Sequence, residues 1–193
     1  TVRDAISDLP PLDARSAQTA KDVDLPLHEV PLLDKTKYFW VSNTPPESGA
    51  FDNQCVVCGC EDNPLHVSRK NKDGINQSSK ETPIYCQNCG SLPPRPTSVN
   101  ADGSLRLMRG FTSAYRRMKW DEPSSTLTRN LSYACSDKKL HPDQNRVLSL
   151  YEAIILHTID DYSYAWQRAS GAKASNKTIR EIIGESIPPR GLQ

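Results

Sequence analysis

Apolar positions in this chain come in short groups, separated by polar and proline-rich stretches. The clearest group is the aliphatic run Ala153–Leu156, which follows Ser149-Leu-Tyr-Glu152. A serine followed three residues later by a glutamate is a capping box, because the serine hydroxyl accepts a hydrogen bond from an orphan amide and the glutamate carboxylate reaches back to the cap amide. The pattern predicts a helix that starts at Leu150.

A similar pattern recurs near the end of the chain. Thr178-Ile-Arg-Glu181 precedes two isoleucines, which predicts a second short helix that Gly184 helps to end. A third helix is expected at the beginning of the chain, where the residues are acidic and helix-like. The expected helices lie near residues 1–9, 149–158 and 178–184, and their exposed apolar side chains, expected to pack on another part of a larger protein, include Ile154, Leu156 and Ile182.

The composition limits how much regular structure can form. The chain has 193 residues, 36% of them hydrophobic, and a mean hydropathy of -0.62. This length allows one domain or two small ones, with little material for one large core. The 15 prolines interrupt helices and strands because proline lacks an amide donor. We therefore expect a loop-rich α+β fold with short strands and a few short helices.

Charge and hydropathy exclude some classes of protein. The net charge of +1 does not by itself indicate a nucleic-acid partner, although a balanced total can contain a local basic field. The longest aliphatic run is far shorter than the roughly 20 residues that span a bilayer, and the first residues do not resemble a signal peptide. We expect a soluble, cytoplasmic and nucleoid-associated protein with no membrane partner.

Four of the cysteines form two copies of one motif, Cys-x-x-Cys-Gly. Two thiolates spaced in this way on a tight turn can bind one tetrahedral ion, and the glycine lets backbone amides approach the sulfur atoms. Two such turns make a closed site without an open coordination position, so the metal is expected to be structural. The motifs predict a zinc site in a zinc-ribbon-like module over 50–96, with the ligands Cys55, Cys58, Cys86 and Cys89.

Other assignments of the cysteines stay open from the sequence. Two disulfides, or reduced buried thiols, are alternatives to the metal, but stable disulfides are rare in intracellular proteins. Cys60 could replace Cys58 as a ligand, and His66 could be a further one. Cys135 stands alone and is expected to be a small buried apolar side chain rather than a nucleophile. Lys70–Gly74, between the two motifs, is expected to form the turn at the tip of the module.

Basic and aromatic residues alternate between Asp102 and Asp121, with no acidic residue between them. Arginine can bridge phosphate oxygens or read guanine O6 and N7, so this stretch is the best candidate for a DNA-facing surface. From charge alone, the alternative is a solvated basic face beside aromatic core residues. The candidate side chains are Arg106, Arg109, Arg116, Arg117 and Lys119, interleaved with Phe111, Tyr115 and Trp120.

The order of several short motifs resembles the C-terminal part of DNA cytosine-5 methyltransferases. In that family a Thr-Leu or Thr-Ile pair, a His-Pro, an Arg-x-Leu-Thr-x-Arg-Glu helix and an Ile-Gly-Asn-x-Val-Pro-Pro turn follow one another. The opening Thr1–Leu12 resembles the segment after the family's eighth motif. The matching motifs in this chain are Thr126-Leu127, His141-Pro142, Arg146-Val-Leu-Ser149 with Glu152, and Ile183-Gly-Glu-Ser-Ile-Pro-Pro189.

The resemblance implies roles for these residues. The segment between the eighth and ninth motifs is the target-recognition domain, which enters the major groove, and its Thr-Leu pair, here Thr126 and Leu127, lies near the backbone of the everted cytosine. The tenth motif lines the S-adenosylmethionine pocket, which implies Gly184, Glu185, Ser186 and Ile187 as cofactor-binding residues. Glu185 stands where the family has asparagine, and Tyr151 and Ile155 stand where the ninth motif has arginines.

The resemblance also implies a division of the chain. It predicts an N-terminal helix and linker after the eighth motif over 1–49, the ribbon insertion over 50–96, a DNA-recognition segment over 97–140, and the ninth-motif helix with the tenth-motif turn over 141–193.

The chain contains none of the family's catalytic motifs, neither Phe-x-Gly-x-Gly nor Pro-Cys, Glu-Asn-Val or Gln-x-Arg-x-Arg. No catalytic residue is therefore assigned. The resemblance implies the part of the enzyme that recognises double-stranded DNA, active only with a catalytic subunit or an N-terminal catalytic domain that carries the first eight motifs. A non-catalytic zinc-ribbon DNA-binding module is the alternative. The recognised DNA sequence, and whether the enzyme belongs to a restriction system or is a solitary methylase, stay open.

Overall fold

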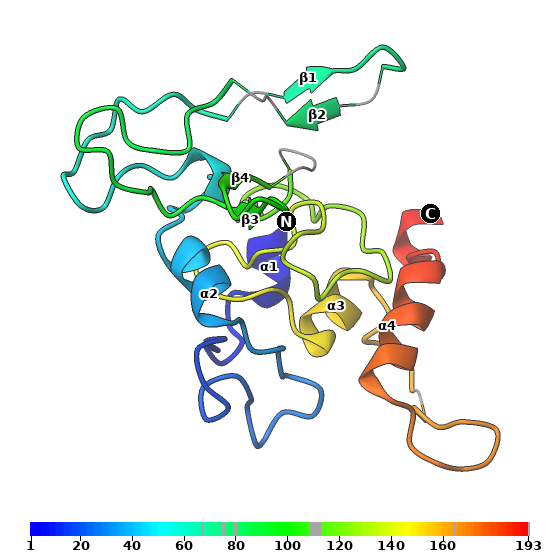
Figure 1. Cartoon of the computed structure of the whole chain (residues 1–193). Helices are drawn as coiled ribbons and strands as arrows, with labels where there is room; N and C mark the ends of the chain where they lie inside the picture. The colour runs from blue at the N-terminus through cyan, green and yellow to red at the C-terminus, as the bar shows by residue number, and fades with distance from the viewer. Residues whose placement is uncertain (67, 75, 79–80, 109–112, 164, 193) are drawn as a thin grey trace.

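The fold consists of short helices and two hairpins joined by long loops (Figure 1). The computed structural model describes residues 1–66, 68–74, 76–78, 81–108, 113–163 and 165–192. The expected α+β class with few short helices is confirmed. The elements are α1 (Val2–Ile6), α2 (Lys35–Ser42), η1 (Ala50–Asp52), β1 (Ser68–Lys70), β2 (Asn76–Ser78), β3 (Thr97–Val99), β4 (Leu105–Leu107), α3 (Leu150–Leu156), α4 (Asn176–Glu185) and η2 (Pro189–Leu192), where η marks a 3₁₀ turn.

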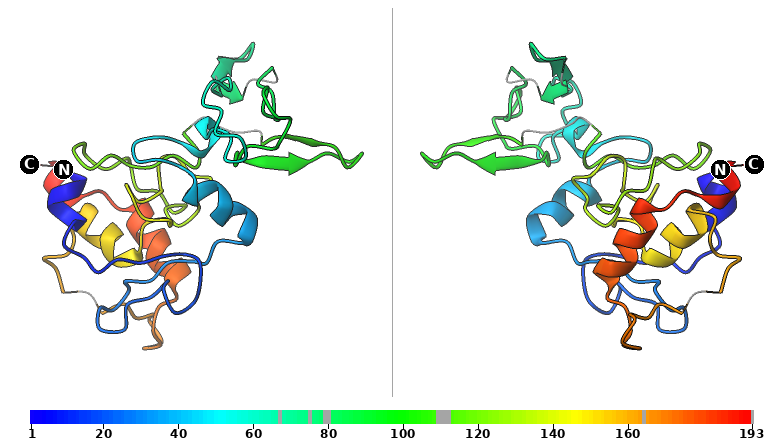
Figure 2. Two further views of the ribbon diagram at one scale, coloured as in Figure 1. Left: turned by 90° about the vertical axis from the view of Figure 1, so that its left-hand side faces the viewer. Right: turned by 90° about the vertical axis from the view of Figure 1, so that its right-hand side faces the viewer.

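The strands form two separate antiparallel hairpins that extend away from the helices (Figure 2). In the first, Lys70 pairs with Asn76, and the expected turn at the tip is confirmed, with Gly74 at a φ of +75°. In the second, Val99 pairs with Leu105. The hairpins therefore form one end of the molecule, and the packed helices the other.

The predicted helix start at Leu150 is confirmed. The Ser149 hydroxyl accepts from the Glu152 amide at 3.1 Å, and the Glu152 carboxylate accepts from the Ser149 amide at 2.7 Å. Glu152 also receives two hydrogen bonds of 2.7 Å from the guanidinium of Arg146, and both side chains are buried. Although burial raises the pKa of Glu152, the hydrogen bonds from Arg146 hold it below its ordinary value. One carboxylate thus caps α3 and neutralises a buried arginine.

The predicted start and end of the last helix are wrong. The cap is Ser175, whose hydroxyl accepts from the amide of Thr178 at 3.2 Å, so α4 begins at Asn176 and Thr178 lies inside it. The helix also continues through Gly184 to Glu185. From the sequence, either Ser175 or Thr178 could cap the helix. The structure has Ser175 as the cap, because the helical residues begin before Thr178.

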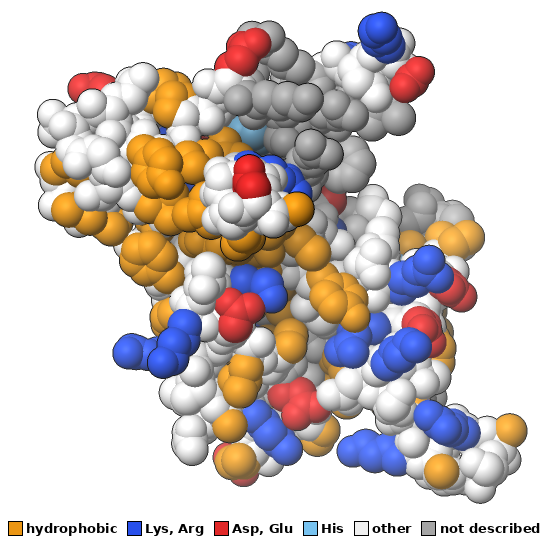
Figure 3. Space-filling model, viewed as in Figure 1, with side chains coloured by type: hydrophobic (Ala, Val, Ile, Leu, Met, Phe, Trp, Pro, Cys, Tyr) orange, Lys and Arg blue, Asp and Glu red, His pale blue; other side chains and the backbone are white. Residues whose placement is uncertain are grey.

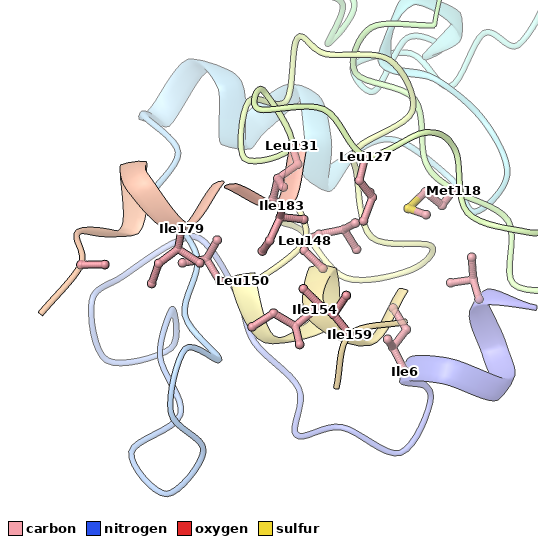
Figure 4. Close-up of a cluster of buried hydrophobic side chains, with 13 residues drawn as sticks. Ile6, Met118, Leu127, Leu131, Leu148, Leu150, Ile154, Ile159, Ile179 and Ile183 are labelled. Atoms are coloured by element: carbon pink, nitrogen blue, oxygen red, sulfur yellow. The ribbon is translucent and has the colours of Figure 1, made fainter. Parts of the chain in front are cut away.

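The largest hydrophobic core joins helices from both ends of the chain. It contains Val2 and Ile6 of α1, residues of α3 and α4, and side chains from the loops between them. Figure 4 shows Leu127 and Leu131, from the loops before α3, beside Ile183 of α4 and Leu148. The expectation that Ile154 is exposed is wrong, since it is 7% exposed in this core, whereas Ile182 is 48% exposed and Leu156 is half-buried.

A second core lies under the base of the hairpins. Trp40 of α2 meets Tyr115 edge to face at 5.6 Å, and Phe51 of η1 meets the same ring at 6.4 Å.

Within the described residues, no helix is both long and apolar enough to cross a membrane.

Replacing Glu152 by glutamine is expected to lower the free energy of unfolding by about 3–5 kcal/mol, because the buried Arg146 guanidinium loses its counter-charge. Urea unfolding measures the loss. The exposed ion pair between Lys177 and Glu181, 3.9 Å apart, supplies the control, and Lys177→Gln is expected to leave the unfolding midpoint unchanged. A Glu152→Gln variant as stable as the control would contradict a structural role for the buried pair.

Candidate functional site

The two Cys-x-x-Cys-Gly motifs adopt the same backbone conformation. The amide of Gly59 donates to the Cys55 carbonyl at 3.1 Å, and the amide of Gly90 donates to the Cys86 carbonyl at 2.9 Å. Both glycines have a φ near +70° (70° and 71°), which side-chain-bearing residues rarely adopt. Each motif is therefore a tight turn that ends where the sequence places its glycine.

The turns bring four sulfur atoms together. Cys55 Sγ lies 3.6 Å from Cys89 Sγ, Cys58 Sγ lies 3.7 Å from Cys86 Sγ, and all four atoms lie within 4.8 Å of one another. Four thiolates at about 2.3 Å from one zinc ion are separated by about 3.8 Å along the edges of the tetrahedron. The observed spacing therefore fits a tetrahedral ion. All four cysteines are free thiols, so the structure does not contain the two disulfides of the alternative assignment.

Backbone amides prepare two of these thiols for metal binding. Hydrogen bonds from the Cys89 and Asn88 amides lower the pKa of Cys86 to about 6. Ser91 lowers the pKa of Cys89 through its side chain and its amide. A thiolate is the form that binds a metal, so these donors favour the required charge state at Cys86 and Cys89. The Cys60 backbone and Asn88 act in the same direction on Cys58, but the neighbouring thiols and burial raise its pKa to about 11.

The structure also addresses the other candidate ligands. Among the described residues, the cluster that could hold an ion consists of the four motif cysteines, without Cys60 or His66. His66 is buried and stacks on Phe51, with ring centroids 4.8 Å apart. The expectation for Cys135 is wrong, because this cysteine is exposed.

The candidate DNA-facing side chains lie in different environments. Arg116 pairs with Asp52 at 2.8 Å and is partly exposed, and the exposed Lys119 pairs with Glu122 at 2.6 Å. Arg106 lies in β4 and is half-buried. Arg109, together with Gly110 and Phe111, lies outside the described residues.

Arg117 is turned into the protein. It is 3% exposed, and its guanidinium donates to the carbonyls of Thr44 at 2.8 Å and Val41 at 3.0 Å. It also donates to the carbonyl of His141 at 2.9 Å and to that of Gln144 at 2.5 Å. Burial lowers the pKa of Arg117 to about 10. The side chain joins the loop after α2 to the His-Pro loop, so it holds the surface together from behind.

The Thr-Leu pair divides between surface and core. Thr126 is exposed, whereas Leu127 is 6% exposed and packs in the largest core. The leucine thus anchors the loop on which the threonine is exposed.

Gly184, the first of the implied cofactor-binding residues, packs closely against this loop. A methyl group built at Gly184 would lie 2.6 Å from Arg129 Cα and would overlap the backbone of Thr128. Glu185, Ser186 and Ile187 are exposed. The close approach explains why a glycine stands inside α4, where glycine otherwise destabilises a helix.

Ser186 shares a hydrogen bond with a buried histidine. The Ser186 hydroxyl and the His157 Nε2 atom lie 2.8 Å apart, and the hydroxyl also donates to the Ile183 carbonyl at 3.0 Å. Burial lowers the pKa of His157, which favours a neutral ring. The bond attaches the segment after α4 to the end of α3.

Apolar side chains gather on the surface near the hairpins (Figure 3). Such a concentration is typical of surfaces that contact another macromolecule. Exposed large apolar residues of the ribbon and the β3–β4 hairpin include Val56, Val57, Leu65, Tyr85 and Val99.

Part of the chain is similar to known methyltransferases. The similarity to Type II methyltransferases covers 40–64% of its length, which confirms the resemblance to a part of a methyltransferase. No family model matches the chain.

Three relatives carry this similarity. Type II methyltransferase M1.HgaI of Avibacterium volantium is 29% identical over 64% of this chain and 35% of its own length. Type II methylase M.HgiDII of Herpetosiphon aurantiacus is 32% identical over 40% of this chain and 21% of its own length. Type II methyltransferase M.AgeI of Thalassovita gelatinovora is 35% identical over 42% of this chain and 17% of its own length. The chain therefore spans about a third or less of these relatives.

Sequence reasoning missed two lysines near the Thr-Leu loop. The buried Lys139 ammonium donates to the Ser125 hydroxyl at 2.7 Å and to the Asp137 carbonyl at 2.6 Å. Its exposed neighbour Lys138 lines a cleft with Ser125. The Lys-Lys pair was visible in the sequence, but nothing in the pattern indicated that the two lysines lie beside Ser125.

The purified chain is expected to contain about one zinc ion per molecule, because four free thiols at tetrahedral spacing form one closed site. Cys86→Ser is expected to lose the ion and to destabilise 50–96. Elemental analysis and the absorption of the cobalt-substituted protein report both. Cys135→Ser is the matched control and is expected to retain the metal. Well under one ion in the unmodified chain would reject the metal site.

Gly184→Ala is expected to destabilise the protein by about 1–3 kcal/mol, because the new methyl group overlaps the backbone at Thr128 and Arg129. At an ordinary helical position the same change stabilises by up to about 1 kcal/mol, so the sign of the effect is the test. Thermal unfolding measures it, with Lys177→Ala on the exposed side of α4 as control. A stabilised Gly184→Ala variant would disprove the close packing of α4 on this loop.

Proposed function

We propose that the chain is the DNA-recognition and cofactor-pocket-completing part of a DNA cytosine-5 methyltransferase. The observation that carries the proposal is the contact between Gly184, which lies in α4 within the segment that resembles the tenth motif, and the loop that follows Thr126-Leu127. The family uses the tenth motif at the methyl donor and the Thr-Leu pair at the DNA backbone. Their packing into one unit supports a shared task, and the similarity to Type II methyltransferases supports the reaction class.

The DNA-facing surface is proposed to centre on Thr126. Thr126 is exposed on a loop that Leu127 anchors in the core, as a contact to a nucleotide backbone requires. Arg116 and Lys119 lie on the same segment as solvent-accessible charges, and Arg106 and Arg109 precede them. Arg117 acts in this proposal as a support for the surface, because its donors are occupied by carbonyls.

The cofactor-facing surface is proposed to be the segment after α4. Gly184 fixes the path of the backbone, while Glu185, Ser186 and Ile187 stay accessible for a ligand or for the rest of the pocket. S-adenosylmethionine would supply the methyl group when bound there. An acidic side chain at Glu185 is suited to accept hydrogen bonds from hydroxyl or amino groups of such a ligand.

The reaction belongs to the assembly with a catalytic part. The C5 atom of a cytosine is not accessible inside the base stack, so the base must be turned out, at a cost of a few kcal/mol that protein contacts offset. This chain would hold the duplex and the displaced nucleotide's backbone. The catalytic part, which carries the first eight motifs, would supply the cysteine nucleophile.

The zinc ribbon is proposed to brace the DNA-reading surface. Two contacts connect them: the Arg116 guanidinium forms an ion pair with Asp52 at 2.8 Å, and the amide of Ala50 donates to the carbonyl of Tyr115 at 2.9 Å. Metal binding would then stabilise the hairpin whose tip is Lys70–Gly74, since the ion supplies much of the folding free energy of such a module.

The test is methyl transfer to duplex DNA from labelled S-adenosylmethionine. The chain alone is expected to give no product, and the chain with the catalytic part is expected to give 5-methylcytosine. Thr126→Ala should lower kcat/KM of the assembly roughly tenfold to a hundredfold, the effect of one lost hydrogen bond to a charged group. Thr36→Ala, at an exposed position of α2, is the matched control and should leave the rate unchanged.

The outcomes separate the two candidate functions. Methylation by the isolated chain would refute the division of labour between two parts. DNA binding at low salt without any methylation in the presence of the catalytic part would favour the non-catalytic zinc-ribbon DNA-binding module. Methylation of a base atom other than C5 would retain the methyltransferase role and refute its cytosine-5 assignment.

A further inference from the structure

A cleft of about 440 Å³ opens beside the Thr126 loop, with Ser125 in its wall. Basic side chains outnumber acidic ones in this wall. The basic lining residues are Arg116, Arg117, Lys119 and Lys138, and the acidic ones are Glu47 and Glu122.

The charges at the rim are only partly paired. Lys119 forms an ion pair with Glu122, and Lys138 lies close enough to lower the pKa of that carboxyl group further. Within the described part of the chain, no carboxylate lies within ion-pair distance of Lys138, which is exposed. Lys138 is therefore the rim cation best able to take a new anionic partner.

Two buried cations lie behind the rim. Arg117 is hydrogen-bonded to backbone carbonyls and to the Asn145 side-chain oxygen at 3.0 Å, all of them neutral. Lys139, 1% exposed, is hydrogen-bonded to the Ser125 hydroxyl and the Asp137 carbonyl, also neutral. In the part of the chain that the structure describes, neither cation forms an ion pair. Their field is only weakly screened by solvent, so it favours an anion in the cleft.

Burial has the expected effect on both groups. It lowers the pKa of Lys139 to about 8 and that of Arg117 to about 10, since a buried charge loses hydration. An anion that docks in the cleft would recover part of that lost stabilisation. The free protein thus lacks an anionic group in the cleft to balance these two cations.

We propose that this cleft binds one phosphodiester group of the DNA, next to the nucleotide that Thr126 contacts, with Lys138 as the direct partner of the phosphate. The assignment rests on the proposed function, because Ser125 adjoins Thr126 and both belong to the loop that faces the duplex in that proposal. Glu47 and Glu122 oppose the phosphate and keep the affinity below its maximum. The ligand is the sugar–phosphate backbone, so the contact positions the protein without reading sequence.

Two single substitutions test the cleft in opposite directions. Lys138→Gln should weaken duplex binding on the order of tenfold at about 50 mM salt and reduce the log–log salt slope by about 0.9, the contribution of one phosphate contact. Glu47→Gln should strengthen binding about twofold to fivefold, because an exposed carboxylate that repels the phosphate is removed. A misfolded variant cannot mimic this gain.

The measurement is fluorescence anisotropy of the zinc-loaded full chain with a labelled duplex over a range of salt concentrations. Lys21→Gln, an exposed lysine outside the cleft, is the matched control, and it should leave affinity and slope unchanged. If the unmodified chain binds DNA and neither cleft variant differs from this control, the cleft assignment fails while the proposed function stands. If the unmodified chain binds no duplex at low salt, the proposed function fails together with the cleft.

Discussion

The buried ion pair between Arg146 and Glu152 is the interaction on which the helical end of the molecule depends. One carboxylate receives two hydrogen bonds from the guanidinium and one from the Ser149 amide, so it determines where α3 begins. From that start, α3 presents Leu150, Ala153 and Ile154 to the core shared with α1 and α4. A pair of this kind costs desolvation free energy, and losing one partner costs more, because the other charge stays buried. The start of α3, and with it the position of α4 and the segment after it, is therefore sensitive to a single charge.

Buried cations solve a problem that the proline-rich loops create. Long loops leave carbonyl groups without the partners that helices and sheets supply, and a buried carbonyl needs a donor. A guanidinium offers five N–H groups in one plane, so one arginine can satisfy several carbonyls at once. Arg117 does this between the loop after α2 and the His-Pro loop, and Arg95 does it at the base of the ribbon. Loops take the place of a large sheet in this fold because arginines, rather than neighbouring strands, complete their hydrogen bonds.

Local patterns predicted what is decided locally. The Ser149–Glu152 box and the two Cys-x-x-Cys-Gly turns depend on residues within a few positions, and the structure has both as expected. The start of α4 was wrong because Ser175 and Thr178 compete for the same role and only the fold selects between them. The burial of Arg117 was not visible, since its partners lie more than 20 residues away and are backbone atoms without a sequence signal. The role of Gly184 was misread for a related reason, because a glycine required by close packing and a glycine that ends a helix look the same in one sequence.

The same cations that complete the loops also determine the electrostatic character of the surface beside Thr126. Arg117 and Lys139 are held by neutral acceptors, so their charge is not cancelled where it is buried. A net charge of +1 for the whole chain conceals this, because most carboxylates lie elsewhere on the exposed surface, where solvent screens them. Pairing either buried cation with a carboxylate would improve its local solvation and would also remove the field that attracts a phosphate. In the proposed complex, a phosphate in the cleft would supply the counter-charge that neither cation has among the described residues.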